Sequence, residues 1–342
     1  MGDGTRAGSG YLVYAAAFVI VVAGMREAQG LLVPFLLSIF IAIIAAPALS
    51  YLTSHRIPTG IALVLVIASI AGGGMLLGVL IGSSVDDFSA QLPEYQQKLH
   101  QQTQALRQWL EKIGVDVPEA ALSKLVDPRK AMTMAAQGLS SLGSLLTNTF
   151  LILLTVIFIL LEASSFPAKL HRILKNPAHS YPTFEQFVYT IKRYMAIKTL
   201  TSLLTGLLVI VWLSMIGVDY PLLWGVMAFF LNYVPNIGSI IAAVPAVLLA
   251  LVQLGSGAAI WTIVGYLVVN NLVGTLIEPR FMGRDLGLST LVVFLSLVFW
   301  GWVLGTIGMF LSVPLTMTLK IALDSREQTR WMAILLGPEI KA

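Results

Sequence analysis

Seven long runs without a charged residue occupy most of this chain. They span residues 7–25, 28–54, 57–85, 131–161, 199–218, 220–277 and 286–319. A hydrocarbon core about 30 Å thick takes roughly 20 helical residues, so each run is long enough to cross a bilayer. With 57% hydrophobic and 11% charged residues, the sequence predicts an all-α, polytopic helical membrane protein. Soluble enzyme folds and disordered tails are excluded, and so are outer-membrane barrels, because these runs do not alternate polar with apolar residues.

The 58-residue run 220–277 has to turn back within itself, because a straight helix of that length would measure about 87 Å. The stretch 253–257, which contains two glycines, is the expected hinge. About eight spans result, at residues 11–25, 29–52, 58–83, 140–161, 196–217, 221–252, 258–277 and 287–319. The last run, 286–319, exceeds one perpendicular span, so it is either one long tilted helix or a re-entrant hairpin.

Basic residues indicate the orientation of these spans. With the N-terminus in the cytoplasm, twelve lysines and arginines fall inside, whereas the short outside loops hold only Arg26, Arg280 and Arg284. The positive-inside rule therefore places both termini in the cytoplasm. The net charge of +4 is small and no block of consecutive basic residues occurs, so a nucleic-acid partner is not expected.

A polar stretch, residues 86–130, interrupts the apolar runs and carries a helical pattern of its own. Pro93 suits the first turn of a helix that starts in this stretch. A seam with 3–4 spacing comprises Leu92, Tyr95, Leu99, Gln102, Leu106, Trp109 and Ile113. This seam either pairs with neighbouring subunits, with Gln102 fixing the register, or packs on helices of its own chain.

A polar patch that contains a proline, residues 229–239, interrupts the longest apolar run. If a helix starts at Pro221, the 11 residues to Leu231 rise about 16 Å, half the hydrocarbon core. Pro235 removes a backbone donor and Gly238 permits unusual dihedral angles, so a broken helix is predicted near mid-membrane. Unwound backbone persists at this depth only where it is buried in protein or lines a wet cavity.

Such a break is a candidate site for a polar solute. The second half-helix, starting near Ser239, would aim free amide donors at the gap, with Asn236 as a candidate cap. The alternative is a kinked structural helix in which Asn232 and Asn236 satisfy the freed backbone. On the first interpretation the site comprises Asn232, Pro235, Asn236, Gly238 and Ser239.

The last apolar run repeats part of this pattern. The pair Ile-Gly at 237–238 is followed by Val-Pro at 244–245, and the pair at 307–308 is followed by Val-Pro at 313–314. Gly308 lies about 18 Å of helix from Lys320, again about half the membrane depth. Paired interruptions in two halves of a chain are typical of the central site of a transporter. Gly305 and Gly308 therefore join the candidate site.

Five further side chains inside or beside the spans are candidates. These are Lys198, Glu278, Arg280, Asn270 and Asn271. Lys198 opens a helical row of small polar residues and either faces a cavity or extends to the interface. Glu278 and Arg280 belong either to a gate of charge pairs within 278–285 or to a solvated loop. Asn270 and Asn271 are costly in lipid and are expected to face protein or water.

Enzyme signatures are absent from the sequence. It contains no HExxH, no phosphate-binding GxxxxGK[ST] loop and no GxSxG elbow, and its four histidines lack metal-ligand spacing. The absence of cysteine excludes disulfides and thiolate metal sites. We therefore expect no catalytic residues, no metal and no cofactor. A solute would be driven by a gradient or by simple diffusion.

Three stretches of the sequence match a known family. They read PFLLSIFIAIIAAP (34–47), NYVPNIGSIIAAVPAVLLAL (232–251) and EPRFMGRDLGLSTLVVFLSLVFWGWVLGTIGMFLSVPLT (278–316). They resemble the autoinducer-2 exporter family of bacterial inner-membrane proteins, and the resemblance is strongest over 220–323. It implies an eight-span homopentamer that exports a small hydrophilic furanone-type quorum-sensing signal, autoinducer-2. Residues that match its signatures are Asn232, Pro235, Asn236, Gly238, Glu278, Pro279, Arg280, Gly283 and the segment 301–308.

The predicted organisation of the chain has five parts. They are an N-terminal three-span region (1–85), the polar helical insertion (86–130), span four with a cytoplasmic linker and an amphipathic helix (131–198), a C-terminal transport core with two interrupted helices (199–323) and a cytoplasmic tail (324–342). The expected partners are the small-molecule substrate, membrane lipid and further copies of the chain.

Two alternatives to an exporter remain. Some relatives resemble sodium or lithium/proton antiporters, for which Glu278, Asp285 or Glu162 would titrate. The broken segments contain no acidic residue, which favours a neutral solute over a cation. The third hypothesis is a non-transporting membrane scaffold organised by the seam at 92–113.

Overall fold

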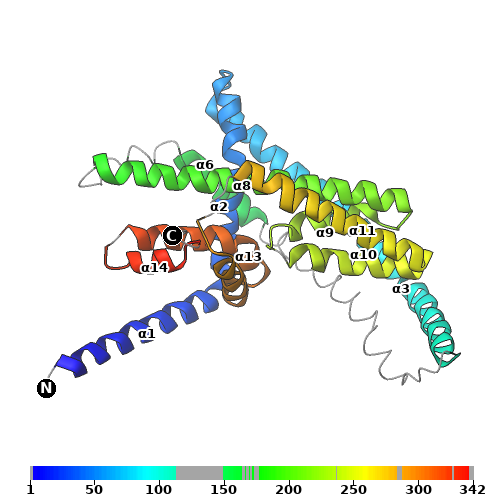
Figure 1. Ribbon diagram of the computed structural model, residues 1–342. Coiled ribbons are helices and arrows are strands. Elements are labelled where there is room, and N and C mark those ends of the chain that lie inside the picture. The colour runs from blue at the N-terminus through cyan, green and yellow to red at the C-terminus, as the bar shows by residue number, and fades with distance from the viewer. Residues whose placement is uncertain are drawn as a thin grey trace. The chain divides into compact units, whose positions relative to one another are not determined.

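The computed structural model describes residues 3–112, 149–163, 166, 169, 172, 177–235, 237–282, 287–325 and 327–338. Every regular element within these ranges is a helix (Figure 1). The all-α prediction is therefore confirmed for the described part of the chain.

The described helices run in the following order. They are α1 (Asp3–Glu27), α2 (Gln29–Ser54), α3 (Thr59–Lys112), α6 (Thr149–Ala163), α8 (Pro177–Ile216), α9 (Pro221–Leu231), α10 (Gly238–Leu254), α11 (Ser256–Asn270), the π-helix η1 (Asn271–Ile277), α12 (Glu278–Met282), α13 (Thr290–Asp324) and α14 (Arg330–Leu335).

Five helical segments are long and apolar enough to cross a membrane. They are Gln29–Ser54, Thr59–Phe88, Val188–Ile216, Ser256–Phe281 and Thr290–Asp324. Three shorter apolar helices, α6, α9 and α10, accompany them, and α1 covers the first expected span. Only 6% of the apolar 18-residue stretch within Thr59–Phe88 is buried, which suits a helix surface that faces lipid or another subunit. A polytopic helical membrane protein is confirmed.

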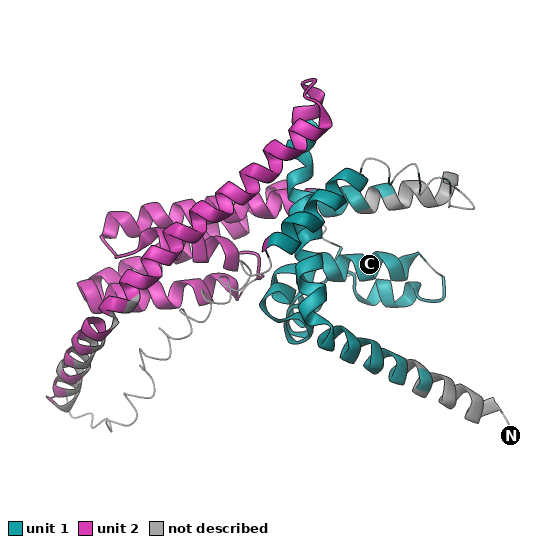
Figure 2. Ribbon diagram, turned by 180° about the vertical axis from the view of Figure 1, so that it is seen from behind, with its two compact units in different colours: residues 1–51, 150–192, 285–342 teal, residues 52–149, 193–284 magenta. Residues whose placement is uncertain are grey.

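The chain divides into two compact units (Figure 2). Unit 1 comprises residues 1–51, 150–192 and 285–342, and unit 2 comprises 52–149 and 193–284. This division differs from the predicted domains. The predicted boundary at 85/86 falls inside α3 and the boundary at 198/199 inside α8.

Helix α3 joins the third expected span to the polar insertion without a break. We expected a new helix to begin near Pro93, but α3 continues through this proline. The segment between the apolar part and Pro93, residues 83–92, contains neither glycine nor proline, so nothing in it ends the helix. The insertion therefore starts as a rigid extension of a membrane helix.

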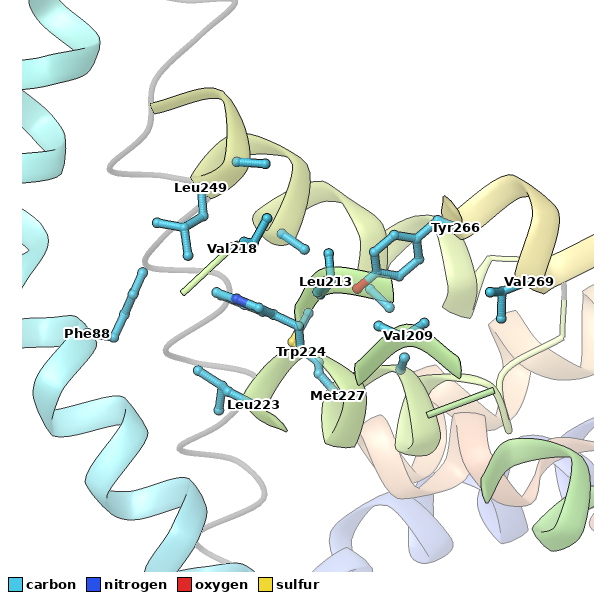
Figure 3. Packing of buried hydrophobic residues seen from close by; sticks show 14 of the residues in the cluster. Phe88, Val209, Leu213, Val218, Leu223, Trp224, Met227, Leu249, Tyr266 and Val269 are labelled. Atoms are coloured by element: carbon cyan, nitrogen blue, oxygen red, sulfur yellow. The ribbon is translucent and has the colours of Figure 1, made fainter. Parts of the chain in front are cut away.

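Unit 2 is built around a cluster of buried apolar side chains from α3, α8, α9, α10 and α11 (Figure 3). Trp224 lies at its centre and is fully buried, and Phe88 of α3 packs edge-on against its indole. Two glycines bring α8 and α9 together, since a Cβ on Gly225 would lie 2.8 Å from the carbonyl oxygen of Gly206. Small residues at such crossings permit the close van der Waals packing that holds helices together in lipid.

Helices α9 and α10 form a re-entrant hairpin, so the expected single span 221–252 is wrong. The backbone N–H of Asp219 donates to Oε1 of Gln253 at 2.9 Å, and Nε2 of Gln253 donates to the carbonyl of Gly217 at 3.3 Å. Residues before α9 and at the end of α10 therefore lie side by side. The proline and glycine signals located the break correctly, but they did not reveal that the chain reverses.

Helix α13 is also a hairpin, which decides between the two readings of 286–319. Gly305 has φ 67° and ψ −153°, far from helical values, and separates the arms 290–304 and 306–324. Nε1 of Trp300 donates to Oγ1 of Thr316 at 2.9 Å, and Nζ of Lys320 donates to the carbonyl of Gly287. In a straight helix, the second pair would be separated by about 50 Å.

The tip of the α13 hairpin lies beside the turn between α1 and α2 in unit 1. The guanidinium of Arg26 sits 4.7 Å from the ring centre of Trp302, and a Cβ on Gly305 would lie 2.8 Å from Nε2 of Gln29. The tip therefore packs on the turn that joins α1 and α2, and its predicted position at half the membrane depth stays a prediction.

Helix α14 packs against the start of α13. The backbone N–H of Ser289 donates to the carbonyl of Leu336 at 3.1 Å, and Oγ1 of Thr329 donates to the carbonyl of Leu323 at 2.6 Å. The described part of the predicted cytoplasmic tail is therefore folded onto unit 1.

Candidate functional site

A row of polar side chains follows the buried face of α8 in unit 2. Lys198, Thr201, Ser202 and Thr205 are all buried, and their spacing of three to four residues keeps them on one side of the helix. The hydroxyls of Thr201 and Thr205 donate to the carbonyls of Lys198 and Thr201, at 3.1 and 2.9 Å. The row is therefore a polar strip inside an apolar helix.

The tip of the α9–α10 hairpin meets this strip. Nδ2 of Asn232 donates to Oγ of Ser202 at 3.0 Å, and the hydroxyl of Tyr233 donates to Oγ1 of Thr199 at 2.8 Å. Ser202 lies midway along the apolar segment Val188–Ile216. The tip therefore contacts α8 at the middle of this apolar segment, and its depth in the membrane stays a prediction.

Pro235 and Gly238 shape the turn at the tip. The carbonyl of Pro235 accepts a hydrogen bond from the backbone N–H of Ile237 at 2.7 Å, which closes a tight turn. A Cβ on Gly238 would lie 1.8 Å from the carbonyl oxygen of Leu231. No other residue fits at this position without moving the backbone. The N-cap residue of α10 is Ile237, whose side chain makes no cap hydrogen bond.

A buried ion pair closes one end of the strip. Nζ of Lys198 lies 2.8 Å from Oε1 and 3.0 Å from Oε2 of Glu278. The side chains of the two residues are only 8% and 16% exposed. Removing two charges from water is expensive, so such a pair contributes little net stability, but loss of either partner leaves a buried charge uncompensated.

The π-helix η1 determines where Glu278 points. Its seven residues follow α11 directly, and the backbone N–H of Glu278 donates to the carbonyl of Val273, five residues earlier. The wider turn rotates everything after it around the helix axis relative to an α-helix. It thereby sets the direction from which the Glu278 carboxylate approaches Lys198. Segments of this kind occur frequently at functional sites.

A small cavity lies where four helices of unit 2 converge. Its volume is about 10 Å³, and its lining includes four polar residues, Thr205 of α8, Ser239 of α10, and Tyr266 and Asn270 of α11. No charged side chain contributes to the lining.

The structure brings together five of the predicted site residues. Lys198 and Glu278 pair directly, Asn232 binds the strip one turn from Lys198, and Ser239 and Asn270 line the cavity. Asn271 is exposed, and its amide donates to the carbonyl of Leu267 at 2.8 Å. Arg280 is exposed as well. Asn236, Gly283, Arg284 and Asp285 lie outside the described residues.

Gly305 and Gly308 belong to unit 1 and form the tip of the α13 hairpin. A Cβ on Gly308 would lie 2.0 Å from the carbonyl oxygen of Trp300. This matches the contact of Gly238 with Leu231 in the other hairpin, so the short sequence echo corresponds to a shared turn geometry. In both hairpins, a glycine in the returning arm allows the two arms to touch.

The described part of the predicted seam packs on its own chain. Tyr95 is buried, tilts against Phe88 and donates from its hydroxyl to Oδ2 of Asp219 at 2.9 Å. Burial, helped by the Asp219 carboxylate, raises the pKa of Tyr95 far above its usual range, so its hydroxyl remains a donor. The side chains of Leu92, Leu99, Gln102, Leu106 and Trp109, and all of Ile113, lie outside the described residues.

Sequence reasoning identified Asn270 but missed the polar face of α11 to which it belongs. Thr262, Tyr266 and Asn270 are four residues apart, so they lie along one side of this helix. That spacing within an apolar run was the available signal. Gln253, which joins the two ends of the hairpin, was taken only as part of a hinge.

Among the described residues, no group of three or more histidine, aspartate or glutamate side chains is placed to hold a metal ion. The site can therefore offer hydroxyls, amides and one internally neutralised ion pair. Such groups bind small polar solutes through hydrogen bonds, and the described residues form no carboxylate cage.

Comparison with known proteins identifies the family of the chain. The family described as "AI-2E family transporter" matches residues 13–328. The chain is 39% identical over 319 residues to the AI-2 transport protein TqsA of Escherichia coli, covering 93% of each chain. It is 40% identical over 328 residues to a candidate transport protein of Haemophilus influenzae, covering 94% of each. It is 36% identical over 335 residues to YhhT of Escherichia coli, also a candidate transport protein. The chain therefore belongs to the AI-2E family of transporters and is not an enzyme.

Proposed function

We propose that this protein exports autoinducer-2 across the bacterial inner membrane through the polar strip of unit 2. The observation that carries the proposal is the contact between the hairpin tip and α8, where Asn232 meets Ser202 midway along the apolar segment Val188–Ile216. Polar groups at this depth are costly in lipid and typically mark the path of a solute. The 39% identity to a protein named for AI-2 transport supports the choice of substrate.

The driving force is a gradient or simple diffusion, because the sequence contains no phosphate-binding loop. We further propose that the protein works as a homo-oligomer, a pentamer by its family resemblance. The seam that the sequence predicts at residues 92–113 is the surface that we propose for such contacts.

Cation/proton antiport is the second function open to this family. Its carboxylate in the described part of the site would be Glu278, which Lys198 already neutralises at 2.8 Å. A cation would have to displace a buried ammonium group. This observation favours a neutral solute over sodium or lithium.

The decisive experiment measures flux of labelled autoinducer-2 in proteoliposomes, with and without a proton gradient. We expect the variant Asn232→Leu to lose about tenfold or more of its flux, because a buried hydrogen-bonding group is replaced by an apolar one of similar size. Ser202→Ala should weaken flux in the same direction. Ser69→Ala is the matched control, because the Ser69 hydroxyl is exposed and donates to the carbonyl of Leu65 on its own helix.

Three outcomes are informative. Equal flux in the wild type and Asn232→Leu would overturn the proposed path. A pH change driven by sodium that disappears in Glu278→Gln would replace export by antiport. A folded protein that moves neither solute nor cation would favour the hypothesis of a non-transporting scaffold.

A further inference from the structure

Two buried hydroxyls on α11 lack partners in the described structure. They are Oγ1 of Thr262 and the phenolic oxygen of Tyr266. Thr262 is fully buried and Tyr266 is 7% exposed. A buried hydroxyl that leaves water without gaining a hydrogen bond costs free energy, and native proteins rarely keep one without a reason. The two residues lie one turn apart, on the face that carries Asn270.

Tyr266 and Asn270 both line the small cavity between α8, α9, α10 and α11. Figure 3 shows the Tyr266 ring extending from α11 into the cluster, with its oxygen on the inner side. Thr205 and Ser239 also line this cavity, and the Thr205 hydroxyl, which donates to the Thr201 carbonyl, can still accept a hydrogen bond. At about 10 Å³, the cavity has room for roughly one water molecule.

The lining selects a chemical class of ligand. Tyrosine, serine, threonine and asparagine side chains both donate and accept hydrogen bonds, as do the hydroxyl groups of a polyol. An anion would need a basic partner, and a desolvated cation would need carboxylates or a ring of carbonyls. The cavity lining contains no ionisable group other than the Tyr266 phenol.

The cavity also lies at the start of one helix and at the end of another. Ser239 is the second residue of α10 and follows directly on the turn of the hairpin. On the other side, Asn270 is the last α-helical residue before η1 begins. A shift of the hairpin away from α11 would therefore enlarge the cavity without unfolding either helix.

We propose that Tyr266, with Asn270, Ser239 and Thr205, forms the subsite that binds the hydroxyl and carbonyl groups of a small, neutral, polyhydroxylated solute. This proposal deepens the proposed function and rests on it. The described structure is the closed form, in which the subsite has room for only one water. The hairpin separates from α11 to admit the solute, whose polar groups then satisfy the Tyr266 hydroxyl.

The variant Tyr266→Phe separates a ligand contact from a purely structural role. If the hydroxyl binds solute, KM for autoinducer-2 rises about tenfold, the loss expected for one hydrogen bond, while the thermal midpoint stays equal or rises. If the hydroxyl is only an unpaired structural group, the midpoint again stays equal or rises, but KM is unchanged. Tyr189→Phe is the matched control, because Tyr189 is 62% exposed.

A binding assay keeps the subsite testable even if transport of autoinducer-2 fails. Autoinducer-2 and D-ribose, each at millimolar concentration, should raise the thermal midpoint of the wild type and of Tyr189→Phe, and not that of Tyr266→Phe. Asn270→Leu, a second variant, should behave like Tyr266→Phe.

The outcomes distinguish this proposal from the proposed function. Normal transport with an unchanged KM in Tyr266→Phe and Asn270→Leu would overturn the subsite and leave export intact. Stabilisation by D-ribose alone, dependent on Tyr266, would support the subsite and overturn the choice of autoinducer-2. Stabilisation by neither solute, or equally in all variants, would overturn the subsite.

Discussion

Gly238 makes the re-entrant turn possible because it lacks a side chain. A Cβ at this position would lie 1.8 Å from the Leu231 carbonyl oxygen, which is backbone and cannot rotate away. We expect Gly238→Val to lower the free energy of unfolding by about 1–3 kcal/mol or more, as overpacking does, and to reduce flux. Thermal unfolding in detergent measures the first effect. Gly257→Ala is the control, with nothing within 4 Å of its Cβ, and equal midpoints for both variants would contradict the turn geometry.

The Lys198–Glu278 pair predicts an asymmetry between single and double variants. Lys198→Ala leaves the Glu278 carboxylate buried and unpaired, so we expect a loss of about 3–5 kcal/mol in unfolding free energy. Replacing both residues, as Lys198→Met with Glu278→Leu, should cost much less or nothing. A double-mutant cycle on denaturation in mixed micelles measures this coupling.

An exposed ion pair provides the comparison. Lys98 and Glu94 also lie 2.8 Å apart, but their side chains are 45% and 62% exposed. Glu94→Ala should therefore change stability by less than about 1 kcal/mol. Equal losses of unfolding free energy in Lys198→Ala and Glu94→Ala would mean that the Lys198–Glu278 pair is solvated.

At the residue scale, the sequence predicted the site only in part. Lys198 and Asn232 could be singled out because polar groups inside apolar runs are costly in lipid. The partner of Lys198 could not be deduced, because Glu278 reaches it only through the π-helix, which has no simple sequence signature. Tyr266 was overlooked because tyrosine is common in apolar segments, and its unpaired hydroxyl becomes visible only in three dimensions.

At the level of elements, Gln253 stabilises the base of the α9–α10 hairpin, where the end of α10 lies beside the residues that precede α9. Its amide bridges Asp219 and Gly217, on a connection where Tyr220 adopts a left-handed conformation with φ 57°. Such a conformation is strained for a residue with a side chain, so it depends on its surroundings. Phe88 packs on the Tyr220 ring at 5.9 Å and adds support from α3.

We expect Gln253→Ala to loosen the base of the hairpin while leaving the membrane helices intact. Amide hydrogen exchange should increase over residues 217–220 and 251–255, because two hydrogen bonds that join these segments are lost. Gln97→Ala, at an exposed position of α3, is the control. Unchanged exchange in Gln253→Ala would show that packing around Trp224 alone holds the base.

The sequence predicted helices well and their directions poorly. Long apolar runs identify membrane helices by length alone, and proline and glycine mark where they break. Whether the chain continues or reverses after a break depends on distant contacts. Gln253 with Asp219, and Trp300 with Thr316, bring together residues 34 and 16 positions apart. No local sequence pattern encodes these contacts, so the reversal of the chain in both hairpins could be recognised only from the structure.

At the scale of the whole molecule, the two hairpins change the expected membrane topology. The expected arrangement took 221–252 and 287–319 as crossings, which placed Arg280 outside. With both as hairpins, the chain leaves the α9–α10 hairpin on the side where it entered, and α11 to α12 then cross to the inside. We therefore predict that Arg280 lies on the cytoplasmic face and that Arg26 lies in an outside loop. This arrangement strengthens the positive-inside bias and keeps the predicted cytoplasmic location of both termini.

Single cysteines test this topology directly, because the chain has none of its own. Ser256→Cys and Arg280→Cys lie at the two ends of the crossing formed by α11, η1 and α12. We expect a membrane-impermeant maleimide to label Ser256→Cys, and not Arg280→Cys, in spheroplasts with an intact inner membrane. Ala28→Cys and His55→Cys are the outside and inside references, since both arrangements agree on them. Labelling of Arg280→Cys with protection of Ser256→Cys would restore 221–252 as a single crossing and mean that the α9–α10 hairpin does not exist in the membrane.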